Sequence, residues 1–118
     1  MGEHVLGPLE DREIRMSTGF AAGGGYTYQG LCGTVAAGVM IIGGLLGRTS
    51  PDGDDDDCQQ LTALYRSRFE ARFGTLICGE LREEKYGSGG AEPCSALVRR
   101  ASALLLECIE DFQADRES

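Results

Sequence analysis

The feature that most constrains the fold is an almost wholly apolar run at residues 31–47, which reads LCGTVAAGVMIIGGLLG. Its apolar residues do not favour one helical face, which is typical of a helix buried on most sides. The run is short for a membrane span and rich in glycine, so we expect a core helix of a bundle rather than a transmembrane segment. Gly33 and Ala37 are four residues apart, and small residues at this spacing let another helix approach closely.

Other segments of the chain also carry helical patterns, and no segment alternates convincingly at a period of two. Apolar residues recur at helical spacing along 55–73, which Gly74 ends, and along the last segment. We predict an all-α fold with one domain over residues 1–118, built as a bundle of about four helices around the Gly/Ala-rich central helix. The further helices are predicted at residues 8–19, 55–73, 79–86 and 93–114.

Three segments predict loops. Residues 19–30, GFAAGGGYTYQG, contain three consecutive glycines, which allow backbone angles that other residues resist. Residues 48–57 are acidic, but no glutamate stands at the twelfth position counted from Asp52 or Asp54, so an EF-hand is excluded. The acidic run therefore indicates a solvated helix start, and residues 88–92, SGGAE, indicate a third loop.

The charge balance excludes several function classes. The formal net charge is -8 and the pI is near 4.5, so the surface repels phosphate backbones and anionic lipid headgroups. We therefore expect no nucleic-acid partner and no membrane association. The single histidine, His4, lies near the N-terminus, which excludes a histidine-based triad or a multi-histidine metal site.

The chain contains five cysteines in 118 residues, which is an unusually high content for a chain of this composition. An odd number argues against a fully paired secreted framework. The first residues, MGEHVLGPLEDREIR, contain no apolar stretch of a signal peptide. We therefore expect a reducing, cytoplasmic compartment, in which thiols are reactive, metal-bound or buried rather than paired.

The positions of the cysteines suggest chemistry. Cys32, Cys78 and Cys94 fall at the predicted starts of helices, where the helix dipole and free N–H groups favour the thiolate and lower the thiol pKa. We take these three as candidate catalytic residues and as candidate metal ligands. Cys58 follows four aspartates and Cys108 lies within an apolar stripe, so both are interpreted as small core residues.

Two kinds of chemistry, and one alternative without chemistry, fit this pattern. There is no CxxC motif, which leaves a thioredoxin-type dithiol and a zinc ribbon unsupported. Three thiolates can hold an iron–sulfur cluster or a transition metal with one open ligand position, or two can cycle as a disulfide while the third resolves it. The alternative is a non-catalytic structural or interaction protein, a homo-oligomer or partner subunit that associates through its small-residue helix faces.

The stretch Cys32-Gly33-Thr34-Val35-Ala36-Ala37 and its flanks GFAAGGG and VMIIGGLLGR resemble the family of redox-active proteins named for the arrangement C_GCAxxG_C_C. FEARFGTLICGEL and EPCSALVRRAS resemble the segments around the family's third and fourth cysteines, here Cys78 and Cys94. The resemblance covers about residues 17–112 and implies redox or metal chemistry at these thiols. Thr34 and Ala37 replace the usual Ala and Gly of the motif. The family's first cysteine precedes the glycine-rich loop, and residues 1–31 contain none.

Overall fold

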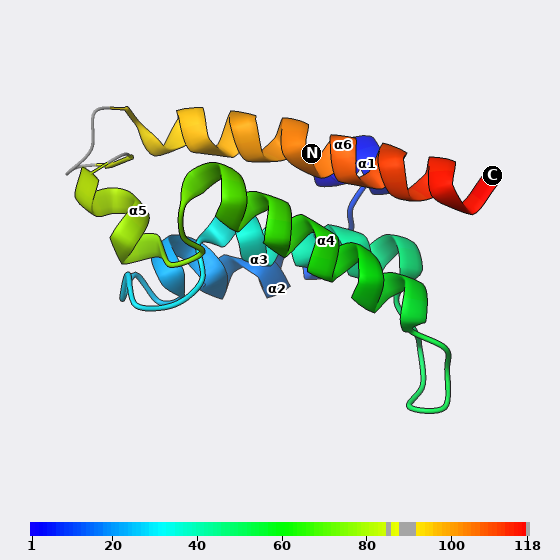
Figure 1. The fold of residues 1–118 in the computed structure, drawn as a ribbon. Helices are drawn as coiled ribbons and strands as arrows, with labels where there is room; N and C mark the ends of the chain where they lie inside the picture. Colours follow the sequence, from blue (N-terminus) through cyan, green and yellow to red (C-terminus); the bar gives the residue numbers. More distant parts are fainter. Residues whose placement is uncertain (85, 88–91, 118) are drawn as a thin grey trace.

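The computed structural model describes residues 1–84, 86–87 and 92–117, and these residues form a helical fold (Figure 1). A 3-10 helix, η1, follows the second α-helix and leads into the glycine-rich loop. The elements in chain order are α1 (Gly2–Leu6), α2 (Asp11–Ser17), η1 (Thr18–Gly23), α3 (Gly33–Leu46), α4 (Asp56–Phe73), α5 (Cys78–Glu84) and α6 (Cys94–Glu117).

β structure in the described part of the chain is limited to two isolated bridges, Leu31–Ile77 and Tyr86–Glu92. The predicted all-α class is therefore confirmed. The predicted loop at 88–92 falls, except for its last residue, outside the described residues.

The three longest helices, α3, α4 and α6, pack against one another pairwise (Figure 1). Their facing sides form the core, whose most deeply buried side chains include Val35, Ile42, Leu61, Tyr65, Phe69, Leu104, Leu105 and Cys108. The short helices α1 and α2 lie beside α3 and η1 at the edge of this core. The expected bundle of about four helices is thus not confirmed, because three long helices carry the core.

Sequence patterns locate the ends of the long helices well. Helix α4 ends at Gly74, whose φ of 92° is left-handed and whose N–H donates to the Glu70 carbonyl at 2.8 Å. At its start, the negative charges of Asp56 and Asp57 face the positive end of the helix dipole. Asp57 also forms a salt bridge with Arg116, which joins the start of α4 to the end of α6.

The apolar run at 31–47 becomes helix α3 (Gly33–Leu46), as predicted, and α4, α6, α1 and η1 all contact it. Val35 and Ile42 are fully buried, whereas Ala37 and Leu45 are exposed. Burial is therefore uneven around the helix: α4, α6, α1 and η1 all contact α3, and positions such as Ala37 and Leu45 remain exposed. Within the described residues, no helix combines the length and apolar character that crossing a membrane requires.

The close contact of α3 with α4 is made at Gly38 rather than at Gly33 and Ala37. A Cβ on Gly38 would collide with the ring of Tyr65 on α4, lying 2.8 Å from Cζ and 3.0 Å from the hydroxyl. A Cβ on Gly33 would lie 3.5 Å from the Phe20 carbonyl oxygen, which is an ordinary contact, and Ala37 is exposed. The prediction that Gly33 and Ala37 line the close contact is therefore wrong. The small residue that α4 requires is Gly38, the next residue after Ala37.

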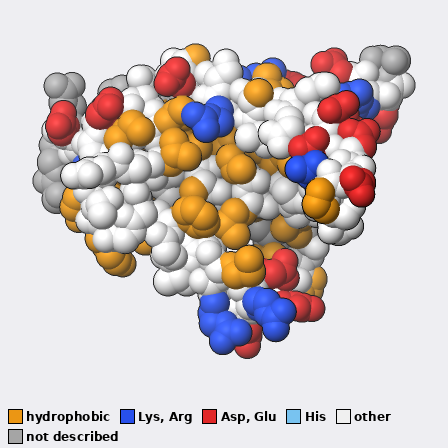
Figure 2. All heavy atoms as spheres, turned by 90° about the horizontal axis from the view of Figure 1, so that it is seen from below, with side chains coloured by type: hydrophobic (Ala, Val, Ile, Leu, Met, Phe, Trp, Pro, Cys, Tyr) orange, Lys and Arg blue, Asp and Glu red, His pale blue; other side chains and the backbone are white. Residues whose placement is uncertain are grey.

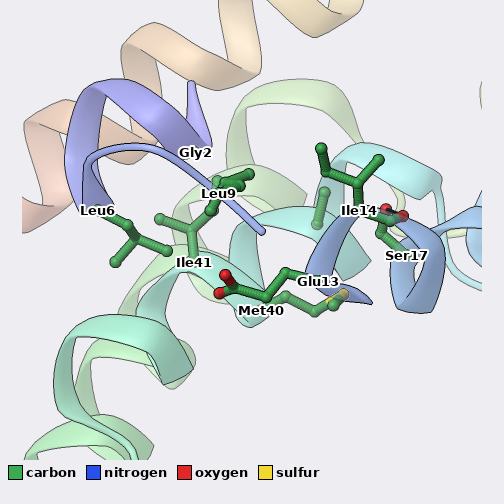
Figure 3. Close-up of a pocket in the computed structure, with 9 residues that line it drawn as sticks. Gly2, Leu6, Leu9, Glu13, Ile14, Ser17, Met40 and Ile41 are labelled. Atoms are coloured by element: carbon green, nitrogen blue, oxygen red, sulfur yellow. Dashed lines mark hydrogen bonds between the residues drawn. The ribbon is translucent and has the colours of Figure 1, made fainter. Parts of the chain in front are cut away.

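The exposed side of α3 borders an apolar groove. Figure 2 shows apolar side chains gathered at the centre of this face, with charged side chains around much of its edge. In Figure 3, side chains from α1, α2 and the segment between them converge over α3 around a hollow of about 270 Å³. Its apolar lining includes Leu6, Leu9, Ile14, Met40 and Ile41.

Candidate thiol site

Cys32 and Cys78 flank the isolated antiparallel bridge between Leu31 and Ile77. The Cys32 N–H donates to the Leu76 carbonyl at 2.7 Å, and the Cys78 N–H donates to the Gly30 carbonyl at 3.0 Å. Each cysteine comes one residue after its bridge residue, so both side chains project from the same face of the paired backbone. Diagonal neighbours in such a pair lie about 7–8 Å apart. The bridge thus brings together two thiols that are far apart in the sequence.

All three candidate cysteines lie at helix starts, as predicted. Cys32 is the N-cap residue of α3, and its carbonyl accepts hydrogen bonds from the first turn of that helix. Cys78 and Cys94 are the first residues of α5 and α6. Cys32 and Cys78 are each 7% exposed, whereas Cys94 is half-buried. Reagents in solvent therefore meet Cys94 before the other two.

Cys32 also has a polar neighbour within its own helix. Its Sγ lies 2.9 Å from the hydroxyl oxygen of Thr34. The Thr34 carbonyl in turn accepts a 3.0 Å hydrogen bond from the buried Tyr65 hydroxyl. This chain of contacts couples the Cys32 thiol to the core contact between α3 and α4.

The pKa of the Cys78 thiol is raised above its usual value, chiefly by burial. The thiol of Cys32 raises it further, the guanidinium of Arg82 lowers it, and the thiol of Cys94 raises it again. The helix-start position predicted a lowered pKa, and for Cys78 that expectation is wrong. Helix α5 has only seven residues, and burial outweighs what its start provides. The same electrostatics place Cys78 within range of both other candidate thiols.

Arg82 is a site residue that the sequence interpretation missed. It lies four residues after Cys78, hence on the same face of α5. Its Nη1 donates a hydrogen bond to Cys94 Sγ at 3.6 Å, and its Cζ lies 4.6 Å from the centre of the Tyr28 ring. The sequence could have indicated Arg82, because its spacing of four residues from Cys78 places a cation one helical turn after a thiol at a helix start.

The glycine-rich loop closes over Cys78. Residues 22–26 all have positive φ angles, between 49° and 90°, and Tyr28 has a φ of 62°. A Cβ on Gly23 would lie 3.1 Å from Cys78 Cβ, so the loop backbone approaches the thiol as only glycine allows. The Gly79 N–H donates to the Tyr28 carbonyl at 2.7 Å, which ties the loop to the first turn of α5.

Cys108 and Cys58 lie away from this arrangement. Cys108 is fully buried in the core, which confirms its interpretation as a core residue. Burial raises its pKa, and Arg68, whose Nη1 is 3.9 Å from Cys108 Sγ, partly offsets this effect. Cys58 is half-buried at the edge of the same core.

The raised pKa values predict a loss of stability at alkaline pH. Cys78, Cys108 and Tyr65 all have pKa values raised first by burial, so the unfolded chain releases these protons at lower pH than the folded protein. Their stabilising contribution is complete below the unfolded thiol pKa of about 8.5 and declines as the pH rises above it. Urea unfolding under reducing conditions at pH 7.5, 9 and 10 measures the decline. Equal free energies of unfolding at the three pH values would contradict it.

The three thiols do not fit a single shared metal ion as they lie. An ion bonded to three thiolates at about 2.3 Å requires sulfur atoms within about 4 Å of one another. Among the described residues, three candidate ligand atoms lie within 4.8 Å of one another at Asp54, Asp55 and Asp56, and the three thiols form no such group. The expectation that Cys32, Cys78 and Cys94 bind one ion therefore requires the sulfurs to move closer together.

Fold and site together define a small helical protein that gathers helix-start thiols at one end, beside a glycine-rich loop. A family model matches residues 2–108, and its description is "Putative redox-active protein (C_GCAxxG_C_C)". The chain belongs to this family, which confirms the resemblance of the motif around Cys32. No curated protein and no solved structure matched the chain.

Proposed function

We propose that the chain is a thiol-based redox protein that works through Cys32, Cys78 and Cys94. The observation that carries the proposal is the position of Cys78. It shares a face of the Leu31–Ile77 bridge with Cys32, and its pKa responds to the thiols of both Cys32 and Cys94. A thiol between two others is the natural partner of either in a disulfide.

The proposed reaction is thiol–disulfide exchange with a disulfide substrate. A thiolate of the site attacks one sulfur of the substrate, forming a mixed disulfide and releasing one substrate thiolate, which takes up a proton. A second thiol of the site, after losing its proton, attacks the mixed disulfide at the protein sulfur and releases the other substrate thiolate, which is protonated in turn. Two electrons pass from the two cysteines, which become a disulfide, to the substrate, which becomes two thiols.

The geometry supports this dithiol chemistry better than single-ion binding. A disulfide requires the Cα atoms of only two cysteines to lie within about 7 Å, which is a small approach from the diagonal spacing of about 7–8 Å expected for Cys32 and Cys78. One ion requires all three sulfurs within about 4 Å of one another. The Leu31–Ile77 bridge and the pKa of Cys78 support reactions between pairs of thiols. Among the described residues, the three sulfur atoms do not form a group close enough to hold one metal ion. We infer that pairwise exchange, with Cys78 as the shared member, is the function that the site serves.

An equilibrium redox titration tests the proposal. The full chain, freed of metal, is equilibrated under argon in a series of glutathione buffers, quenched with acid and alkylated, and its free thiols are counted from the intact mass. We expect two of the five thiols to disappear together in one two-electron transition, with three left free.

Two results would contradict the proposal. One is five free thiols, or only glutathione adducts, at the oxidising end of the series. This outcome would favour the structural or interaction protein, for which the apolar groove over α3 is the expected contact face. The other is stoichiometric iron and sulfide with visible absorption after anaerobic purification, which would favour a cluster over the dithiol.

A further inference from the structure

The guanidinium of Arg82 interacts with two thiols of the site, Cys78 and Cys94. Arg82 lies one helical turn after Cys78, and its charge lowers the Cys78 pKa against the effect of burial. The same guanidinium donates a hydrogen bond to Cys94 Sγ at 3.6 Å. Figure 1 shows α5 and the start of α6 at the same end of the molecule as the glycine-rich loop. Arg82 is thus the residue through which α5 reaches the thiol of α6.

The surroundings of Arg82 fix its orientation. The Tyr28 ring lies 4.6 Å from its Cζ, an arrangement that attracts the cation to the ring. Tyr28 has a positive φ angle, and its carbonyl accepts a hydrogen bond from the N–H of Gly79. A Cβ on Gly87 would lie 3.1 Å from both Arg82 Cζ and Cys94 Sγ. Gly87 therefore leaves the space in which the guanidinium and the thiol meet.

We propose that Arg82 is a positioning residue that makes Cys94 the attacking thiol of the site, with Cys78 as the resolving thiol. The inference rests on the thiol–disulfide function proposed above and assigns its order. Cys94 is the more accessible of the two thiols, and a guanidinium hydrogen bond stabilises the thiolate that attacks. Cys78 is buried and is therefore shielded from substrates.

The order of steps follows from this arrangement. The Cys94 thiolate attacks the substrate disulfide, and one substrate thiolate leaves and takes up a proton. Cys78 then gives up its proton and attacks Cys94 Sγ in the mixed disulfide, and the second substrate thiolate leaves and is protonated. The products are a Cys78–Cys94 disulfide and two substrate thiols, so that two electrons have passed to the substrate.

Site-specific labelling of the full reduced chain tests the role of Arg82. Each cysteine falls in a different tryptic peptide, and Cys94 lies in residues 86–99, so mass spectrometry reports the rate at each thiol separately. With iodoacetamide at pH 7, we expect Cys94 to react fastest and Arg82→Met to slow its labelling about tenfold, as the loss of a charged hydrogen bond implies. Arg82→Lys restores a cation and is expected to recover part of the rate, which a merely structural role would not predict.

Controls separate this inference from the proposed function and from loss of fold. Arg99→Met removes an exposed arginine from the same helix as Cys94, and we expect it to leave the labelling rate unchanged. If Arg82→Met unfolds, Tyr28→Leu keeps the cation without the ring and is expected to slow Cys94 by a smaller factor. Wild-type labelling rates at Cys94 in folded Arg82→Met or Tyr28→Leu would overturn the role of Arg82. If the wild-type chain still loses two thiols in the redox titration, the proposed function survives that result.

Discussion

Gly38→Ala is expected to destabilise the protein, although alanine is the better helix former. The added Cβ would collide with the ring of Tyr65, which is 1% exposed and donates from its hydroxyl to the Thr34 carbonyl. The ring cannot retreat without disturbing its contact with Phe69 on the same helix. Overpacking of this kind costs about 1–3 kcal/mol, which exceeds the helix-propensity gain of about 1 kcal/mol.

Gly43→Ala is the matched control for this effect. Gly43 lies on the same helix, and a Cβ there has no neighbour within 4 Å, so the substitution is expected to stabilise by up to about 1 kcal/mol. Urea unfolding of the two variants under reducing conditions measures the difference. If Gly38→Ala is as stable as the wild type or stabilises as Gly43→Ala does, the close contact between α3 and α4 is not at Gly38.

Cys78→Ala is expected to abolish the intramolecular disulfide altogether. Cys78 is the thiol whose pKa responds to both Cys32 and Cys94, so its removal takes away the thiol that both proposed pairs share. In the glutathione titration, the variant should lose its two-electron transition and form at most mixed disulfides at the remaining thiols. Alanine is chosen because a buried serine hydroxyl would need a hydrogen-bond partner.

Cys108→Ala is the control, because it also removes a buried thiol, but one in the core and away from the site. We expect it to cost stability as a core truncation and to keep the two-electron transition unchanged. A normal transition in Cys78→Ala, or its loss in Cys108→Ala, would show that the redox pair has been assigned to the wrong cysteines.

The sequence located most of the helices because their signals are local. Gly74 ends α4 and the apolar stripe of α6 faces the core, as predicted. The burial of α3 could not be predicted in the same way, since an apolar helix without a preferred face does not indicate which side its neighbours cover. Gly38 was missed for a related reason: only the position of Tyr65, contributed by another helix, distinguishes it from the glycines nearby.

The candidate thiols were predicted from helix starts, but their arrangement was not. The bridge at Leu31 and Ile77 forms between segments far apart in the sequence, and no local pattern announces it. Burial also reversed the expected direction of the Cys78 pKa, because exposure depends on the path of the glycine-rich loop. The role of Arg82 follows only once α5 and the start of α6 are placed together.

The central claim, that Cys78 is the shared member of a redox-active thiol set, is tested most directly by mapping the disulfide of the oxidised protein. The full chain is oxidised with a small disulfide, its remaining thiols are blocked, and the tryptic peptides are analysed without reduction. We expect the Cys78 peptide, residues 73–82, to be joined to the Cys94 peptide, residues 86–99, or to the Cys32 peptide, residues 16–48. An intramolecular disulfide that leaves the Cys78 peptide free, or that joins Cys78 to Cys58 or Cys108, would contradict it.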